Sequence, residues 1–164
     1  MTEYYTPTRV FFGKGAETKL GETLNRDGYK KALLHYGGKS AIESGILERV
    51  EKDLLSNDID YIKVGGVVPN PRVTLVRKAI EEAKKHGSEI IIALGGGSVI
   101  DSAKAIAYGL FNTEGDIWDY YLGERKVKGA FPLAAILTLS ATGSEMSASS
   151  VIANDEGPGD KRGL

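Results

Sequence analysis

Glu89-Ile-Ile-Ile-Ala-Leu-Gly-Gly-Gly-Ser98 is the stretch of sequence that decides the fold. After Glu89, residues 90–94 form a continuous apolar run, which is typical of a strand buried on both faces of a parallel sheet. The glycines end this strand, and the apolar residues from 99 to 110 predict a helix directly after them. A buried strand, a glycine turn and a helix in direct succession indicate an α/β fold.

The alternation of strand and helix extends outward from this stretch in both directions. The apolar periodicity predicts strands at 9–13, 31–36, 59–64, 132–137 and 149–153, and helices at 16–25, 42–55 and 73–86. Such an order with short connections favours one Rossmann-like parallel sheet with helices on both faces, covering residues 1–164 as one domain. Ligands of such sheets bind at the carboxyl ends of the strands, where this sequence is rich in glycine, serine and threonine.

The composition excludes several classes of protein. A net charge of -1 gives no bulk attraction to nucleic acid or to anionic lipid. The sequence has no cysteine and two histidines, which excludes disulfides, thiolate metal sites and a histidine-rich metal site. No segment approaches the about 18 consecutive apolar residues of a membrane span, and the N-terminus does not read as a secretory signal. We therefore expect a cytoplasmic protein whose ligands are small molecules, not nucleic acid or membranes.

The glycine turn Gly95, Gly96, Gly97 and Ser98 is the strongest candidate site. Glycines let the backbone approach an anion closely, and the first turn of the following helix offers unpaired N–H groups with a partial positive charge. We interpret this turn as a pyrophosphate cradle, although it matches neither GxGxxG nor a P-loop. The alternative is a tight turn in which Ser98 caps the helix and nothing binds. Asp101 is either an acid placed for the helix dipole or a polar contact to the nicotinamide end of a dinucleotide.

The turn after strand 31–36 carries the next candidates, Gly37, Gly38 and Ser40. In dinucleotide folds a carboxylate at this turn holds the ribose 2′-OH of NAD, whereas basic and hydroxyl groups accommodate the 2′-phosphate of NADP. The turn has Lys39 and no acid, so it favours NADP(H) over NAD(H). A plain glycine turn with a solvated lysine is the alternative.

Hydroxyl groups follow the last buried strand, at Thr138, Ser140 and Thr142. No histidine or lysine lies beside them in sequence to activate a nucleophile, so hydrogen bonds to phosphate or ribose fit better. The alternative is a helix start capped by serine or threonine. Asn70 lies in a proline-rich loop, 67–71, either against a cofactor or in an ordinary turn. The two histidines, at 35 and 86, fit a core or helix-end position better than a ligand role.

These segments together resemble the iron-containing (group III) alcohol dehydrogenase family, and within it the butanol dehydrogenase-like branch. The resemblance spans nearly the whole chain and implies a Rossmann-like domain that binds NAD(P). By resemblance, Gly96, Gly97 and Ser98 would hold the pyrophosphate, and Lys161 would lie near the nicotinamide ribose. Thr138, Ser140 and Thr142 would line the phosphate and nicotinamide side, Gly38 and Ser40 the adenosine ribose, and Asn70 the length of the cofactor. The matching pieces are Phe11-Phe-Gly13, Tyr36-Gly-Gly38, Pro69-Asn-Pro-Arg72, Gly95-Gly-Gly-Ser-Val-Ile-Asp101 with Ala103-Lys104, and Leu137-Thr-Leu-Ser-Ala-Thr-Gly-Ser-Glu145.

The resemblance also implies a helical second domain in which one aspartate and three histidines bind Fe²⁺ or Zn²⁺. Those ligands would lie beyond Leu164, so we expect this chain to bind the cofactor but not to oxidise an alcohol or reduce an aldehyde by itself. Two alternatives stay open, a relative of glycerol dehydrogenase or dehydroquinate synthase and a non-catalytic nucleotide-binding module. The short strand expected at Val10–Phe12 is a candidate edge for a homodimer.

Overall fold

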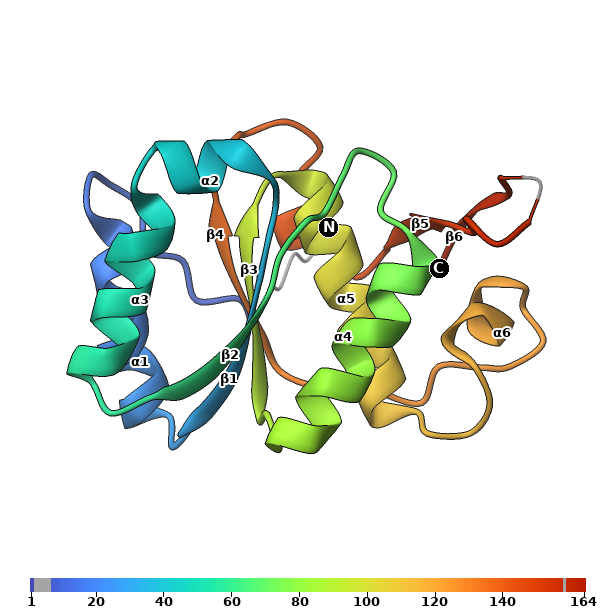
Figure 1. Ribbon diagram of the computed structural model, residues 1–164, viewed down its shortest axis with the longest axis horizontal. Helices are drawn as coiled ribbons and strands as arrows, with labels where there is room; N and C mark the ends of the chain where they lie inside the picture. The colour runs from blue at the N-terminus through green and yellow to red at the C-terminus, as the bar shows by residue number, and fades with distance from the viewer. Residues whose placement is uncertain (2–6, 158) are drawn as a thin grey trace.

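The computed structural model describes Met1 and residues 7–157 and 159–164, and its centre is a four-stranded parallel sheet (Figure 1). The strands lie in the order β2-β1-β3-β4. They comprise β1 (Lys31–Tyr36), β2 (Asp60–Val64), β3 (Ile90–Gly95) and β4 (Leu133–Leu137). All three pairings are parallel, with Leu33 opposite both Ile62 and Ile91.

Helices cover both faces of this sheet, which confirms the predicted Rossmann-like architecture. One face packs against α1 (Leu20–Arg26), preceded by the 3-10 turn η1 (Ala16–Lys19), and α3 (Ile46–Ser56), while the short α2 (Lys39–Glu43) lies at the upper end in Figure 1. The other face packs against α4 (Val73–His86) and α5 (Gly97–Phe111). Successive residues of β3 alternate between the two layers, because Ile91 and Ala93 join the core of α4 and α5 while Ile92 and Leu94 join that of α3.

The remaining elements extend the α4–α5 side of the molecule. The helix α6 (Ile117–Tyr121) begins with a capping box between Asp116 and Asp119. After β4 come the short 3-10 turn η2 (Ser144–Met146) and the antiparallel hairpin of β5 (Val151–Ala153) and β6 (Lys161–Gly163). The expected strand at 149–153 is therefore β5, whereas its partner β6 and the helix α6 were not predicted.

Two expectations about secondary structure are wrong. The helix expected over 42–55 is two helices, because Gly45 adopts a left-handed conformation with φ of 70° and breaks the chain between α2 and α3. The strand expected at 9–13 does not form, and among the described residues no strand pairs with this segment. Phe12 is fully exposed, so its apolar pattern does not reflect burial in the sheet.

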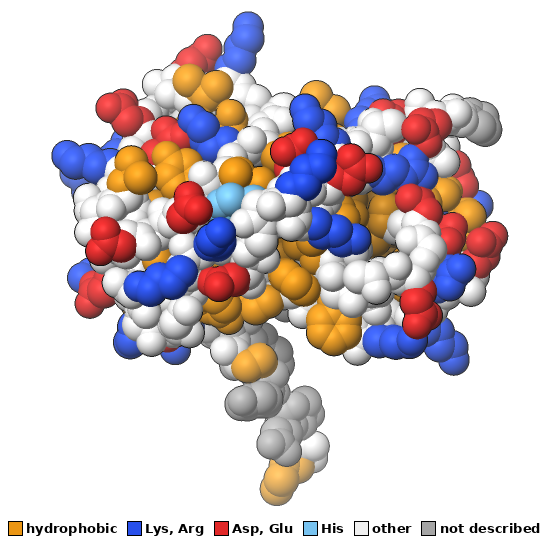
Figure 2. Space-filling view, turned by 60° about the horizontal axis from the view of Figure 1, so that its bottom comes forward, with side chains coloured by type: hydrophobic (Ala, Val, Ile, Leu, Met, Phe, Trp, Pro, Cys, Tyr) orange, Lys and Arg blue, Asp and Glu red, His pale blue; other side chains and the backbone are white. Residues whose placement is uncertain are grey.

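The outer surface mixes charged and apolar side chains. Figure 2 shows acidic and basic groups spread over one face, with hydrophobic groups gathered toward its middle. Within the described part of the chain, no helix is long and apolar enough to cross a membrane.

Candidate functional site

The predicted binding turns meet at the carboxyl edge of the sheet. The chain leaves β1 toward β2 on one side and reaches β3 on the other, so the strand order reverses between β1 and β3. Tyr36 at the end of β1 pairs with Leu94 of β3, and Gly95 pairs with Leu137 of β4. The turns after β1, β3 and β4 are therefore neighbours, at the kind of switch point where open α/β sheets bind ligands.

The glycine turn after β3 leads into α5 without a side-chain cap. Gly96 is the N-cap residue, and its carbonyl oxygen accepts hydrogen bonds from the amides of Val99 and Ile100. Ser98 lies inside the helix, so the alternative in which Ser98 caps it is wrong. Gly95 has φ of 158°, and a Cβ there would lie 2.5 Å from the Val99 Cγ2 atom. The first-turn amides of Gly97 and Ser98 thus have no side-chain acceptor from a cap, which leaves them available to an anion.

The segment after β4 packs closely on this turn. A Cβ on Gly97 would lie 2.8 Å from the Thr142 Oγ1 atom, a distance that side chains essentially never reach. The Thr138 amide donates to the Gly95 carbonyl at 3.1 Å. Thr138, Ser140 and Thr142 are all exposed, and η2 is capped by Gly143 without a side-chain hydrogen bond. The structure therefore brings the predicted hydroxyls and glycines together and does not use the hydroxyls as helix caps.

The turn after β1 lies beside the same helix start. A Cβ on Gly37 would lie 3.3 Å from the Val99 Cγ2 atom, whereas nothing lies within 4 Å of a Cβ on Gly38. Gly38 is the N-cap of α2 and has no side-chain cap. Gly38, Lys39 and Ser40 are exposed, so this turn presents one positive charge and one hydroxyl to solvent and no carboxylate.

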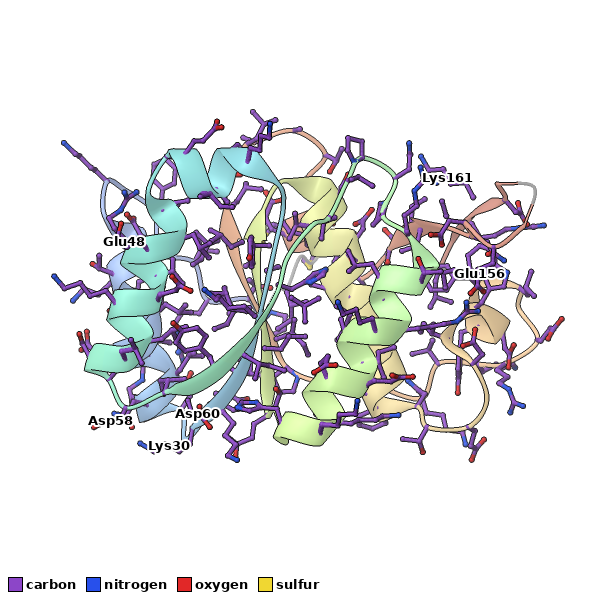
Figure 3. The ribbon with its side chains drawn as sticks, in the orientation of Figure 1. Lys30, Glu48, Asp58, Asp60, Glu156 and Lys161 are labelled. Carbon is purple, nitrogen blue, oxygen red and sulfur yellow. The ribbon has the colours of Figure 1, made fainter. Side chains whose placement is uncertain are left out.

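Asn70 and Lys161 are joined directly to each other. The Lys161 ammonium donates to the Asn70 Oδ1 atom at 2.7 Å, and Asn70 adopts a left-handed conformation with φ of 57°. Lys161 extends from the β5–β6 hairpin toward the loop before α4 (Figure 3). Within the described ranges, no hydrogen bond links either residue to the glycine turn. The pair was not predicted, although both residues were.

The sequence reasoning missed a buried polar cluster beneath the segment after β4. Lys104 of α5 is 7% exposed, and its Nζ donates to the Ser144 Oγ atom at 2.8 Å and the Ser149 carbonyl at 2.7 Å. Ser144 in turn donates to the Asp101 carboxylate at 2.6 Å. Burial lowers the pKa of Lys104, against the opposing effect of Asp101 and Glu145. The available signal was a lysine at an apolar position of a helix, between Ala103 and Ala105.

The two histidines occupy the core and helix-end positions that were predicted for them. His35 is fully buried in β1, with Nδ1 2.8 Å from the Val64 carbonyl and Nε2 2.8 Å from the Ser102 hydroxyl. His86 ends α4 beside Ser88 and Asp60. Among residues 7–157 and 159–164, no three histidine, cysteine, aspartate or glutamate side chains gather as a metal site would need. The described donor set does not fit Fe²⁺ or Zn²⁺, so we assign no step to a metal in this chain.

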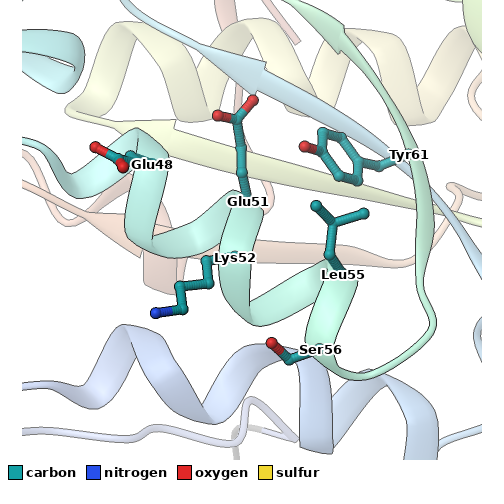
Figure 4. Close-up of a pocket in the computed structure, with 6 residues that line it drawn as sticks. All are labelled: Glu48, Glu51, Lys52, Leu55, Ser56 and Tyr61. Atoms are coloured by element: carbon teal, nitrogen blue, oxygen red, sulfur yellow. The ribbon is translucent and has the colours of Figure 1, made fainter.

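A shallow surface hollow lies away from these turns. It is lined by side chains of α3 and by Tyr61 of β2 (Figure 4). None of the predicted binding residues contributes to it, and its Glu51 carboxylate lies 2.6 Å from the Lys63 ammonium. We therefore place the candidate site at the carboxyl edge of the sheet and not in this hollow.

Known proteins match this chain over nearly its whole length. The family model for iron-containing alcohol dehydrogenases matches residues 7–164. NADH-dependent butanol dehydrogenase A of Clostridium acetobutylicum is 44% identical over 94% of this chain and 39% of its own length. The NADPH-dependent aldehyde reductase YqhD of Escherichia coli is 37% identical over 96% of this chain and 40% of its own length.

Solved structures give the same assignment. The crystal structure of NADH-dependent butanol dehydrogenase A from Thermotoga maritima has a TM-score of 0.94 at 40% identity and covers all of this chain and 41% of its own. The chain thus spans about two fifths of the length of the relatives that it matches. The predicted resemblance is confirmed, and the chain belongs to the iron-containing alcohol dehydrogenase family.

Proposed function

We propose that this chain binds a nicotinamide dinucleotide across the switch point between β1 and β3. The observation that carries the proposal is the uncapped start of α5, where Gly97 has no room for a side chain beside Thr142. Free amides, a glycine backbone and exposed hydroxyls at one sheet edge fit a pyrophosphate.

Each turn then receives one part of the dinucleotide. The amides of Gly96, Gly97 and Ser98 would hold the pyrophosphate. Gly95 ends β3 and has no side chain that would stand in the way of the phosphates. Thr138, Ser140 and Thr142 would donate to phosphate or ribose oxygens, with Asp101 nearby through Ser144. Gly37, Gly38 and Ser40 would receive the adenosine ribose. Asn70 and Lys161, held together by their hydrogen bond, would act as a unit near the nicotinamide ribose.

We further propose that NADP(H) is preferred over NAD(H). The turn after β1 carries Lys39 and lacks the carboxylate that would repel a 2′-phosphate. The butanol dehydrogenase of C. acetobutylicum is named for NADH and the aldehyde reductase of E. coli for NADPH, so relatives of both kinds exist. The preference rests on the turn itself.

The reaction that this site would serve is hydride transfer between the nicotinamide and an alcohol or aldehyde. When bound, the cofactor supplies or accepts the hydride, and this chain's residues bind and orient it. The described residues offer no metal ligand cluster to polarise the substrate oxygen. We therefore propose that the chain by itself binds the cofactor and does not turn over an alcohol.

Titration of the purified chain with NADPH and with NADH, followed by nicotinamide fluorescence, tests the binding proposal. We expect saturable binding of both, with NADPH tighter. Absence of binding of either at millimolar concentration would overturn the proposed function, and tighter NADH binding would overturn the preference. A parallel assay with butanal and NADPH should give no oxidation above the protein-free control.

A further inference from the structure

A buried lysine holds the segment after β4 against α5. The Lys104 side chain comes from the middle of α5, where its neighbours Ala103, Ala105 and Ile106 are completely buried. Its ammonium donates to the Ser144 hydroxyl and to the Ser149 carbonyl. One side chain of the helix thus contacts two points of the segment that lie five residues apart.

Asp101, one helical turn before Lys104, is hydrogen-bonded to the same segment. Its carboxylate accepts hydrogen bonds from the Ser144 hydroxyl at 2.6 Å and from the Val151 amide at 3.3 Å. It lies 4.0 Å from the Lys104 ammonium. The Ser144 hydroxyl therefore accepts from Lys104 and donates to Asp101, so both its proton and its orientation are determined. We call Asp101, Lys104 and Ser144 the clamp.

Burying an ammonium group here has an energetic cost. Removal from water destabilises the charged form, which is why the pKa of Lys104 is lowered. Replacing a buried charged network by apolar residues of similar volume is often neutral or stabilising, so a buried ammonium group is not in itself a gain in stability. The clamp is therefore better explained by the geometry that it imposes than by the stability that it contributes.

The clamp determines the position of the hydroxyls proposed to contact the cofactor. Between the Thr138 amide, bonded to Gly95, and Ser144, the segment is exposed. Ser144 is two residues from Thr142, whose Oγ1 atom lies so near Gly97 that a Cβ there would be only 2.8 Å away. Loss of the Ser144 contact would free the chain at one of the two ends that hold Thr142 in place.

Resting on the proposed function, we infer that Lys104 is a positioning residue for the dinucleotide. Acting through Ser144, it orients Thr142 and its neighbours toward the pyrophosphate and nicotinamide half without touching the cofactor. Among the described residues, no hydrogen bond joins the clamp to the turn after β1, which is proposed to receive the adenosine half. This division predicts that Lys104 affects the two halves of the ligand unequally.

The test compares Lys104→Met, Ser144→Ala and the control Lys85→Met, which removes an exposed lysine of α4. The probes are whichever of NADPH and NADH binds the unmodified chain more tightly, and the matching adenosine half, adenosine 2′,5′-bisphosphate or AMP. We expect Lys104→Met to weaken the dinucleotide by about tenfold, a usual effect of losing a supporting contact. The adenosine half should change by less than about twofold.

A double-mutant cycle separates positioning from general loss of structure. The loss of dinucleotide affinity in the Lys104→Met/Ser144→Ala chain should be smaller than the sum of the two single losses, because both changes remove the Lys104–Ser144 hydrogen bond. Hydrogen exchange of residues 138–147 should become faster in Lys104→Met while that of β1 is unchanged. Where Lys104→Met does not fold, Ser144→Ala supplies the same comparison.

Each outcome is decisive. Equal loss of both probes, or full retention of dinucleotide binding in Lys104→Met and Ser144→Ala, overturns the inference and leaves the proposed function intact. No binding of either dinucleotide to the unmodified chain overturns the proposed function, and the positioning role falls with it. A loss as large in Lys85→Met would also contradict a specific role of Lys104.

Discussion

The turns after β1 and β4 lie at the same sheet edge but are held in opposite ways. The turn after β1, residues 37–40, is open, with nothing within 4 Å of a Cβ on Gly38 and no side-chain cap on α2. The segment after β4, residues 138–151, is tied to α5 by buried hydrogen bonds from Lys104 and to Asp101. The turn after β1 is held by backbone hydrogen bonds, including that of the Gly37 amide to the Leu94 carbonyl, whereas the segment after β4 is held by side chains about 40 positions away in sequence.

This difference shows where the site can be altered with little effect on the rest of the structure. A change at Gly38, Lys39 or Ser40 should affect mainly what the open turn presents to a ligand, because these residues are exposed and nothing lies within 4 Å of a Cβ on Gly38. A change in the clamped segment affects the positions of other side chains as well. The following experiments break or sharpen this contrast.

The largest effect should come from crowding the contact between α5 and the clamped segment. In Gly97→Val the new Cβ would lie 2.8 Å from the Thr142 Oγ1 atom, and the branched side chain would occupy the pyrophosphate cradle. We expect dinucleotide affinity to fall by about 100-fold, or about 3 kcal/mol, in a fluorescence titration. Gly38→Val in the open turn is the comparison, and it should weaken binding by about tenfold or less, since its Cβ meets no other residue and only the proposed ribose. Equal losses in the two variants would remove the contrast.

His35 links the strand before the open turn to α5, and it makes stability depend on pH. Burial lowers its pKa from 6.5 to about 4, against a raising effect of its hydrogen bond to Val64. The unfolded chain therefore binds the additional proton between these values, so the stabilising contribution is complete above pH 6.5 and is lost as pH falls toward 4.

We expect the free energy of unfolding to fall by about 2 kcal/mol between pH 7.5 and pH 5 because of this one group. Urea unfolding at several pH values measures the slope, and His35→Gln should flatten it. A variant with the same slope as the unmodified chain would assign the pH dependence to other groups.

The parts of the fold that followed from sequence are those determined by local pattern. The apolar run after Glu89, residues 90–94, predicted a fully buried strand, and β3 is buried at every residue. The left-handed Gly45 was not separable from a glycine tolerated in a helix, so α2 and α3 were merged. The segment 9–13 has a strand composition but no partner strand among the described residues, and pairing cannot be inferred from one strand alone.

The candidate site was predictable to the same extent. The glycine and hydroxyl positions were identified because parallel strands bring their carboxyl ends to one edge. The clamp was not, because Lys104, Ser144 and Asp101 meet only through tertiary packing across 40 and 43 positions of sequence. The Asn70–Lys161 hydrogen bond spans 91 positions and was equally inaccessible.

A substitution in the open turn should change the preference between NADPH and NADH, with a smaller loss of affinity than that expected for Gly97→Val. In Gly38→Asp the carboxylate would face the adenosine ribose, repel a 2′-phosphate and accept a hydrogen bond from a 2′-OH. We expect NADPH affinity to fall by about tenfold relative to NADH, with the midpoint of urea unfolding unchanged. Gly38→Asn, which has the same shape without the charge, is the control and should leave the ratio nearly as it was. A loss of stability in Gly38→Asp would show that this turn is less open than its surroundings indicate.

The smallest effect should appear where the chain leaves the clamped segment for the β5–β6 hairpin. Arg77 of α4 forms two hydrogen bonds with Asp116, at 2.7 and 2.8 Å, and an ion pair with Glu156 of the hairpin. These hydrogen bonds lower the pKa of Asp116, so their contribution is complete above the unfolded value of about 3.9 and is lost as pH falls below it.

Because Arg77 is 29% exposed and Glu156 58% exposed, solvent screens this network, and Arg77→Met should cost about 1 kcal/mol at low salt. The loss should shrink in 1 M NaCl, on the order of the salt at which surface pairs are fully screened. Arg26→Met, at an exposed pair with Asp27, is the control and should change stability by less than about 0.5 kcal/mol. Dinucleotide affinity should be retained in Arg77→Met, because the hairpin is also held by the Asp155 carboxylate at the Thr74 amide. A loss of affinity as large as that of Lys104→Met would mean that the hairpin, and not the clamp, positions the segment after β4.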